Sequence, residues 1–175
     1  IGSFMDEQSI IIFSEKQKFG KWVHLIILAI LFFPIAVFLV TYKNDSTEKV
    51  PVEISAVFPI LLSAGIPLIL EILFLFLKLE TKVSNNGLYV RLFPVHINYK
   101  KFTPEEISEA FARKYKPISE YGGWGIKGWR SNNKAYNTRG NEGVQLVFKN
   151  GKKLLIGSQK SQELEKAITT IMRDR

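Results

Sequence analysis

Three glycines, Gly123, Gly125 and Gly128, formally match the fingerprint of a dinucleotide-binding loop. Such a loop binds pyrophosphate where a buried strand precedes it and a helix follows it, because the helix N-terminus supplies amide groups to the phosphates. Here residues 117–121 precede the glycines, and Trp-Arg-Ser-Asn-Asn at 129–133 follows them, a segment poor in helix-forming residues. We therefore expect the glycines to permit a bend in a sheet and not to hold a nucleotide.

The residue types that most enzymes and metal sites use are scarce. The chain has no cysteine and two histidines, His24 and His96, which excludes zinc–thiolate sites, iron–sulfur clusters and a cysteine nucleophile. The sequence contains no His-x-x-x-His pair and no Gly-x-Ser-x-Gly motif. Glu105, Glu106 and Glu109 are most simply an acidic turn. We therefore expect a protein that is not an enzyme and that carries no catalytic residues, no cofactor and no metal.

Glu71 is the single charged residue in an apolar block that spans residues 57–77. Inside a bilayer a carboxylate costs at least ~2.5 kcal/mol, so such a residue normally faces protein or water. If the apolar blocks of the chain pair as antiparallel helices, His24 lies about one turn from the level of Glu71, and an intramembrane contact between them would be stretched. We favour the alternative in which Glu71 is protonated or extends toward Lys78 and the membrane interface.

The C-terminal part of the chain is strongly basic, since residues 80–175 hold 18 Lys and Arg against 9 Asp and Glu. The candidate contacts to a membrane surface or a partner are Lys114, Lys116, Lys127, Arg130, Lys134 and Arg139. They are interleaved with the aromatic residues Tyr115, Trp124, Trp129 and Tyr136, a mixture that also occurs in nucleic-acid-binding proteins. A domain beside a bilayer would meet anionic lipid first, at ~1 kcal/mol per basic residue, so we expect no nucleic-acid partner. The plainest interpretation is a solvated positive surface over core tryptophans.

Two apolar blocks, at 22–40 and 57–77, contain 19 and 21 residues. A helix of the first length is ~28 Å long, close to the ~30 Å hydrocarbon core of a bilayer. The first block is also longer than the ~7–15 apolar residues of a signal peptide, which favours a retained span. We predict transmembrane helices at 22–40 and 57–79, joined by an external loop at 41–56.

Basic residues set the orientation of these predicted helices. They lie at 16, 18 and 21 before the first block and at 78, 82 and 91 after the second, whereas two lysines in the loop are offset by three acidic residues. The positive-inside rule then places both termini of this predicted integral membrane protein in the cytoplasm. Residues 5–21 would form an interfacial tail with Ile12, Phe19 and Trp22 on one helical face, or a solvated segment. Residues 1–4 precede Met5 and are expected to be a cloning remnant.

Residues 80–175 predict a small β domain closed by a helix. Asn-Gly turns at 85–87 and 149–151 lie between apolar runs, the strongest short-range signal for β-hairpins. Leu164, Ala167, Ile168, Ile171 and Met172 follow a helical spacing and form one apolar stripe. Several short strands followed by one amphipathic helix correspond to a cytoplasmic β-barrel or sandwich of the pleckstrin-homology (PH) type, in which the helix closes one open end.

The chain resembles a known family over most of its length. The similar segments are Phe13-x-Glu15-x-Gln17-x-Phe19-x-x-Trp22, Tyr-Gly-Gly-Trp-Gly-Ile at 121–126, Ala-Tyr-Asn at 135–137, Gly-Val-Gln-Leu at 143–146 and Leu-Ile-Gly-Ser-Gln at 155–159. Together they are similar to small bacterial membrane proteins of unknown function that have two transmembrane helices and a bacterial PH-like domain. The resemblance implies an integral protein of a bacterial inner membrane with a non-catalytic cytoplasmic domain, and it offers no catalytic residues to transfer.

These observations predict a membrane-anchored PH-like module with a binding or scaffolding role. Its expected partners are the lipid bilayer, through anionic headgroups, and a protein, which includes a second copy of the chain. The alternative is an accessory subunit of a membrane transport or envelope-stress assembly, in which Glu71 packs against a partner helix.

Overall fold

The computed structural model describes residues 10–44, 54–128 and 132–173. The chain divides into two compact units, one made of residues 1–19 and 77–175 and the other of residues 20–76. The predicted remnant at 1–4, residues 45–53 of the predicted external loop, and Arg130 lie outside the described residues.

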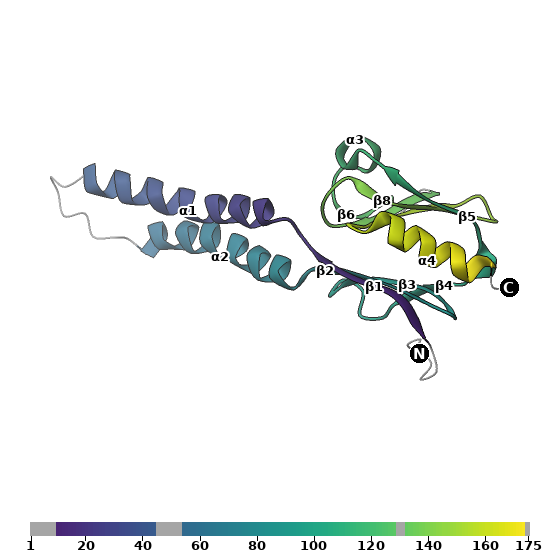
Figure 1. The fold of residues 1–175 in the computed structure, drawn as a ribbon. Helices are drawn as coiled ribbons and strands as arrows, with labels where there is room; N and C mark the ends of the chain where they lie inside the picture. Colours follow the sequence, from purple (N-terminus) through teal and green to yellow (C-terminus); the bar gives the residue numbers. More distant parts are fainter. Residues whose placement is uncertain (1–9, 45–53, 129–131, 174–175) are drawn as a thin grey trace. The chain divides into compact units, whose positions relative to one another are not determined.

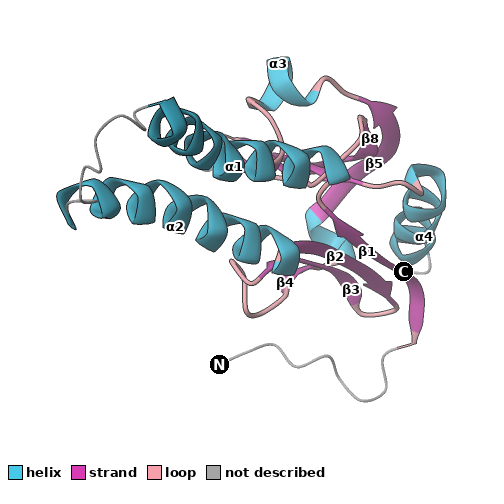
Figure 2. Cartoon of the chain, turned by 90° about the vertical axis from the view of Figure 1, so that its left-hand side faces the viewer, coloured by secondary structure: helices cyan, strands magenta, loops and turns pink. Residues whose placement is uncertain are grey.

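The unit of residues 20–76 is a pair of helices, α1 (Lys21–Asn44) and α2 (Ile54–Phe76), which lie side by side (Figures 1 and 2). Few of their described side chains are buried, and Ile27 is one of them. Large apolar side chains such as Phe33 and Ile69 are instead exposed, at 71% and 67%. Two helices bury little of their apolar surface because each can cover only one side of the other.

The prediction of two membrane spans is wrong. Within the described residues, the structure contains no helix whose length and apolar character suffice to cross a bilayer. This finding also contradicts three predictions that depend on the spans: the helical membrane hairpin, the integral inner-membrane localisation and the orientation derived from the basic residues.

The other unit begins with an antiparallel sheet of four strands in the order β1-β2-β3-β4 (Figure 1). Its strands are β1 (Ile11–Lys18), β2 (Lys78–Ser84), β3 (Gly87–Phe93) and β4 (Lys100–Phe102). The Asn-Gly turn at 85–87 joins β2 to β3, with Ser84 opposite Gly87, which confirms the first predicted hairpin. Gly87 has φ +137°, a conformation that side chains rarely adopt.

β1 takes the place of the predicted interfacial tail. Phe13 and Gln17 are buried, whereas Ile12, Ser14 and Lys16 between or beside them are exposed. This alternation has the period of two that a strand requires and does not fit the helical face predicted from Ile12 and Phe19. Residues 11–18 therefore complete a sheet by pairing with β2, far along the chain.

A second sheet of five strands has the order β5-β8-β9-β7-β6. Its strands are β5 (Ile107–Lys114), β6 (Gly125–Lys127), β7 (Asn133–Asn137), β8 (Glu142–Phe148) and β9 (Lys153–Gly157). A short 3-10 helix, η1 (Pro104–Glu106), precedes β5, and the helix α3 (Pro117–Tyr121) follows it. β8 and β9 form the second predicted hairpin, around the turn at 149–151. β7 and β9 run parallel, whereas the other pairs of this sheet are antiparallel.

The C-terminal helix α4 (Ser161–Arg173) joins the two sheets into one core. Leu164, Ala167, Ile168 and Ile171 are buried on the predicted stripe, and α4 contacts β1, β2 and β3 of one sheet and β5 and β8 of the other (Figure 1). A fully buried Leu or Ile stabilises a fold by ~1.5–3 kcal/mol, so the stripe is a major part of this core. The predicted PH-like barrel or sandwich at 80–175 is nevertheless wrong, because one of the two sheets of this unit takes its edge strand β1 from residues 11–18, outside those bounds.

Candidate functional site

A cationic surface covers the outer side of the sheet β1-β2-β3-β4, and we call it the cationic face. Its basic residues are Lys16, Lys18, Lys78, Lys82, Arg91 and Lys101. They share one side because Lys16 lies opposite Glu80 and Glu80 lies opposite Arg91, while successive side chains of a strand point to opposite sides. The inner side carries buried residues such as Leu79 and Val90. Among the described residues of this outer side, Glu80 is the one carboxylate set against six cations.

Aromatic rings support the cations of the cationic face. The pairs, with the distance from the cation to the ring centroid, are Lys78–Phe93 (5.2 Å), Lys82–Tyr99 (5.1 Å), Arg91–Phe93 (5.5 Å), Arg91–Tyr99 (4.2 Å) and Lys101–Tyr89 (5.6 Å). A cation over an aromatic ring gains about 0.5–1 kcal/mol at an exposed site. Tyr89 is only 1% exposed, so its ring is not open to a ligand. The rings thus hold charged groups in position, and the partly exposed rings of Phe93 and Tyr99 each lie beneath cations.

Glu80 lies at the centre of the cationic face and is itself buried. Its Oε2 accepts hydrogen bonds from Arg91 Nε and from the Tyr99 hydroxyl, both at 2.6 Å, and its Oε1 lies 3.1 Å from Lys78 Nζ. Burial alone would raise the pKa of this carboxyl, but the bonds from Tyr99, Arg91 and Lys78 outweigh it and lower the pKa to about 2. Burial and the bond to Glu80 raise the pKa of Tyr99 to about 12. Glu80 therefore stays ionised at neutral pH and fixes the positions of two cations.

The contact residues predicted from the sequence lie on the other sheet. Lys114 ends β5, Lys116 precedes α3, Lys127 ends β6, Lys134 lies in β7, Arg139 follows β7, and Arg130 is outside the described residues. Lys114 Nζ lies 3.7 Å from the Glu142 carboxylate, but both side chains are exposed, and such pairs contribute little. These residues are distributed over three strands and their connections, and each remains a predicted contact.

The cationic face was missed in the sequence because its members come from distant strands. Lys18 and Lys78 are paired across β1 and β2 although 60 positions separate them in the chain. The available signal was the alternation Lys16-x-Lys18 and Lys78-x-Glu80-x-Lys82, which is typical of one side of a strand. Because residues 5–21 are predicted as an interfacial segment, Lys16 and Lys18 are not assigned to a strand, and the alternation is not recognised as one side of a sheet.

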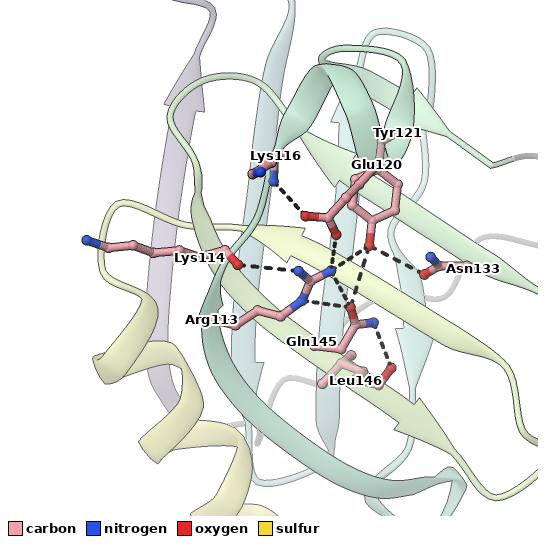
Figure 3. Close-up of polar contacts among 8 residues, drawn as sticks. All are labelled: Arg113, Lys114, Lys116, Glu120, Tyr121, Asn133, Gln145 and Leu146. Atoms are coloured by element: carbon pink, nitrogen blue, oxygen red, sulfur yellow. Dashed lines mark hydrogen bonds and ion pairs between the residues drawn. The ribbon is translucent and has the colours of Figure 1, made fainter.

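A polar network links α3 to the second sheet (Figure 3). Arg113 Nη2 donates to Glu120 at 2.8 Å and to the Tyr121 hydroxyl at 3.1 Å, while its Nε donates to Gln145 at 3.2 Å. Burial disfavours the charge of Arg113, but its bond to Glu120 prevails and raises the arginine pKa, and the same bond lowers the pKa of Glu120. Glu120 also accepts the backbone N–H of Lys116 at 2.7 Å. Because these groups bond mainly to one another, we assign the network to positioning α3.

His24 and Glu71 meet inside the unit of residues 20–76. His24 Nδ1 lies 2.7 Å from Glu71 Oε1, with the side chains 23% and 15% exposed. The contact is close and not stretched, and it replaces the favoured alternative in which Glu71 extends toward Lys78. Glu71 Oε2 is buried and has no hydrogen-bond partner among the described residues. A role for Glu71 against a partner helix stays a prediction.

The glycines at 123–128 and His96 are the remaining residues that the sequence analysis considered for cofactor or metal chemistry. Gly123 and Gly125 have φ values of +114° and +115°, and Gly125 begins the strand β6, where a dinucleotide loop would begin a helix. This agrees with the predicted bend. His96 lies edge-on to Tyr136, with ring centroids 5.6 Å apart, and burial together with Lys100 lowers its pKa. Within residues 10–44, 54–128 and 132–173, no three His, Asp or Glu side chains are grouped to hold a metal ion.

Comparison with known proteins gives one match. A family described as a family of unknown function, DUF6141, matches residues 5–174. No curated protein and no solved structure matches the chain. The resemblance to small bacterial membrane proteins with two spans and a PH-like domain is therefore corrected, because the matched family carries no such description and the described helices include no span.

Proposed function

We propose that this chain, which belongs to the DUF6141 family of unknown function, is a binding module whose cationic face recognises an acidic segment of a protein partner. The observation that carries the proposal is the charge of one side of the sheet, where six cations surround one buried carboxylate. Exposed lysines scattered over a surface are usually solvated and need no partner. Here they are gathered on one side by strand register, and four of the six lie against aromatic rings.

The spacing of the cations favours carboxylates on an extended chain. Lys16 and Lys18 are two residues apart on β1, about 6.6 Å in a strand, and neighbouring strands lie about 4.8 Å apart. An extended peptide with an acidic residue at every second position presents carboxylates at the same repeat. The cation–π contacts already restrict Lys78 and Arg91, so these side chains lose less entropy when they bind.

The arrangement of the aromatic rings, one buried and two beneath cations, argues against recognition of single-stranded nucleic acid. Proteins of that class present open ring faces on which bases stack. On the cationic face the Tyr89 ring is buried, and Arg91 lies over Tyr99 at 4.2 Å. The face therefore offers charge and donors, which suit carboxylates, and little surface for stacking.

The expected affinity is modest and depends on salt. A solvent-exposed charge pair contributes ~0.2–1 kcal/mol, so five or six pairs supply at most ~6 kcal/mol, which corresponds to a Kd of tens of micromolar or weaker. Because the Debye length is ~10 Å at 0.1 M salt and ~3 Å at 1 M, binding should weaken steeply as salt is added.

Fluorescence anisotropy of a labelled peptide with six Ser-Glu repeats tests this proposal on the full chain. We expect binding at low salt, no binding of the matched Ser-Gln peptide, and a loss of about tenfold in the Lys78→Gln/Lys82→Gln variant. The control variant Lys160→Gln/Lys166→Gln removes the same charge from two exposed positions, one just before α4 and one on it, and should bind as the wild type.

Three outcomes contradict the proposal. An equal loss in the control variant would show that only the net charge of the chain matters. Tighter binding of a labelled oligothymidylate than of the acidic peptide would point to nucleic acid instead. Binding of phosphatidylglycerol vesicles without binding of the peptide would replace the protein partner by an anionic lipid surface.

A further inference from the structure

A cavity of about 550 Å³ lies within the unit of residues 1–19 and 77–175. Three segments line it: β4 with the following η1, the beginning of β7, and the hairpin between β8 and β9. None of the members of the cationic face is among the lining residues. The cavity is thus a second feature, separate from the surface that carries the proposed function.

Strand register explains why the Lys100 side chain points into this cavity. On β4, Lys100 and Phe102 lie opposite Val90 and Leu88, whose side chains are buried on the inner side of the sheet. Lys101 between them lies opposite Tyr89 and belongs to the outer side. Two adjacent lysines therefore serve different surfaces, and Lys100 is directed inward.

The floor of the cavity is aromatic and apolar. The rings of Phe102 and Phe148 come from different sheets and lie with centroids 5.4 Å apart at an angle of 41°. Tyr136 and Leu154 are each 3% exposed and complete the floor. Apolar and aromatic lining of this kind buries the body of a small organic ligand.

The rim of the cavity is positively charged. Five lysines line it, against two glutamates: Lys100, Lys134, Lys149, Lys152 and Lys153, with Glu105 and Glu106. The Glu106 carboxylate accepts the backbone N–H of Thr103 at 3.1 Å and so serves the start of η1. Lys100 Nζ donates to the Tyr136 hydroxyl at 2.8 Å, which positions one ammonium group directly at the floor.

We infer that this cavity binds a small organic anion, with an apolar or planar body on Phe102 and Phe148 and a phosphate or carboxylate group at the lysines. The volume lies within the ~300–1,000 Å³ of typical small-molecule sites. An inorganic anion alone would leave the aromatic floor uncovered, and a neutral apolar ligand would leave the lysines without a counter-charge. The combination of an aromatic floor and a cationic rim therefore suits a ligand with both parts.

Titration calorimetry of the full chain with 1-naphthyl phosphate tests this inference. The comparison compounds are 1-naphthol, which has the body without the charge, and inorganic phosphate, which has the charge without the body. We expect 1-naphthyl phosphate to bind at least tenfold more tightly than either. Lys134→Gln and Lys152→Gln change exposed residues of the rim and should each weaken its binding by threefold to tenfold, while Lys166→Gln on α4 should leave it unchanged.

Specific results would overturn the inference. Equal affinity for 1-naphthyl phosphate and 1-naphthol would mean that the compound binds apolar surface alone. Equal affinity for 1-naphthyl phosphate and inorganic phosphate would mean that the floor is not used. A loss caused by Lys78→Gln/Lys82→Gln but not by the rim variants would move the binding to the cationic face. Because the rim variants alter exposed side chains, they should fold normally, and circular dichroism checks this.

Discussion

Replacement of Glu80 by glutamine tests whether the buried carboxylate organises the cationic face. Glutamine has nearly the same size, so Glu80→Gln removes the charge without leaving a cavity. The amide still offers one acceptor oxygen to Arg91 or Tyr99, but it can no longer serve the cations Arg91 and Lys78 as a counter-charge. The variant therefore isolates the electrostatic part of the interaction.

The size of the effect follows from the pKa of Glu80. That pKa falls from 4.5 to about 2 on folding, and one pKa unit corresponds to ~1.4 kcal/mol. Ionisation of Glu80 thus contributes about 3 kcal/mol to the free energy of unfolding at neutral pH. Because the folded pKa is the lower one, the contribution is complete above pH ~4.5 and is lost as the pH falls through ~2. Loss of one partner of a buried ion pair costs a similar ~3–5 kcal/mol.

Urea unfolding followed by near-ultraviolet circular dichroism measures this contribution. At pH 7 we expect the free energy of unfolding of Glu80→Gln to be about 3 kcal/mol below that of the wild type. The difference should narrow by up to ~1.4 kcal/mol per pH unit below pH ~4.5. Glu163→Gln is the matched control, since Glu163 is 64% exposed and lies 3.4 Å from Lys160, and it should change stability by less than ~0.5 kcal/mol.

Two results would refute the reasoning about Glu80. A variant as stable as the wild type at pH 7 would show that the three bonds to Glu80 only balance the cost of burying it. A destabilisation that stays constant from pH 7 to pH 2.5 would show that the substitution disturbs packing, because a loss of packing does not depend on the ionisation of the carboxyl.

Two further substitutions test other buried polar groups. The Thr81 hydroxyl is buried and has no hydrogen-bond partner among the described residues, so Thr81→Val should raise the free energy of unfolding by about 1 kcal/mol in urea titrations; a lower midpoint would contradict this. The pair His24–Glu71 at 2.7 Å should give a coupling energy of roughly 1–2 kcal/mol in a double-mutant cycle of His24→Phe and Glu71→Leu. Coupling near zero would mean that the contact does not stabilise the helix pair.

The local elements of the β-rich unit could be predicted from the sequence because short-range chemistry dictates them. Asn-Gly at 86–87 and 150–151 permits the tight turns that close both hairpins, and the glycines adopt φ values of +137° and +78°. The stripe of α4 has the helical period, and its predicted members are buried except Met172, which is half-buried. Such signals lie within a few residues of one another and need no partner from elsewhere in the chain.

The long-range pairings could not be predicted in this way. Residues 11–18 contain both a strand-like alternation and a plausible helical face, and pairing with β2 decided between them. The apolar blocks predicted membrane spans from length and hydropathy, whereas the helices of the described residues do not meet those requirements. The contact of His24 with Glu71 likewise depends on how α1 and α2 pack. From sequence spacing alone, His24 is expected about one helical turn from the level of Glu71.

Sequence by itself determined that the β-rich unit is basic, free of cysteine and rich in lysines next to aromatic residues. Only the tertiary structure decided where those charges act. Lys100 and Lys101 are neighbours in sequence, yet the pairing of β4 with β3 sends one into the cavity and the other to the cationic face. The physical reason is the two-residue period of a strand: a shift of one residue in register would exchange the two sides, and composition carries no information about register.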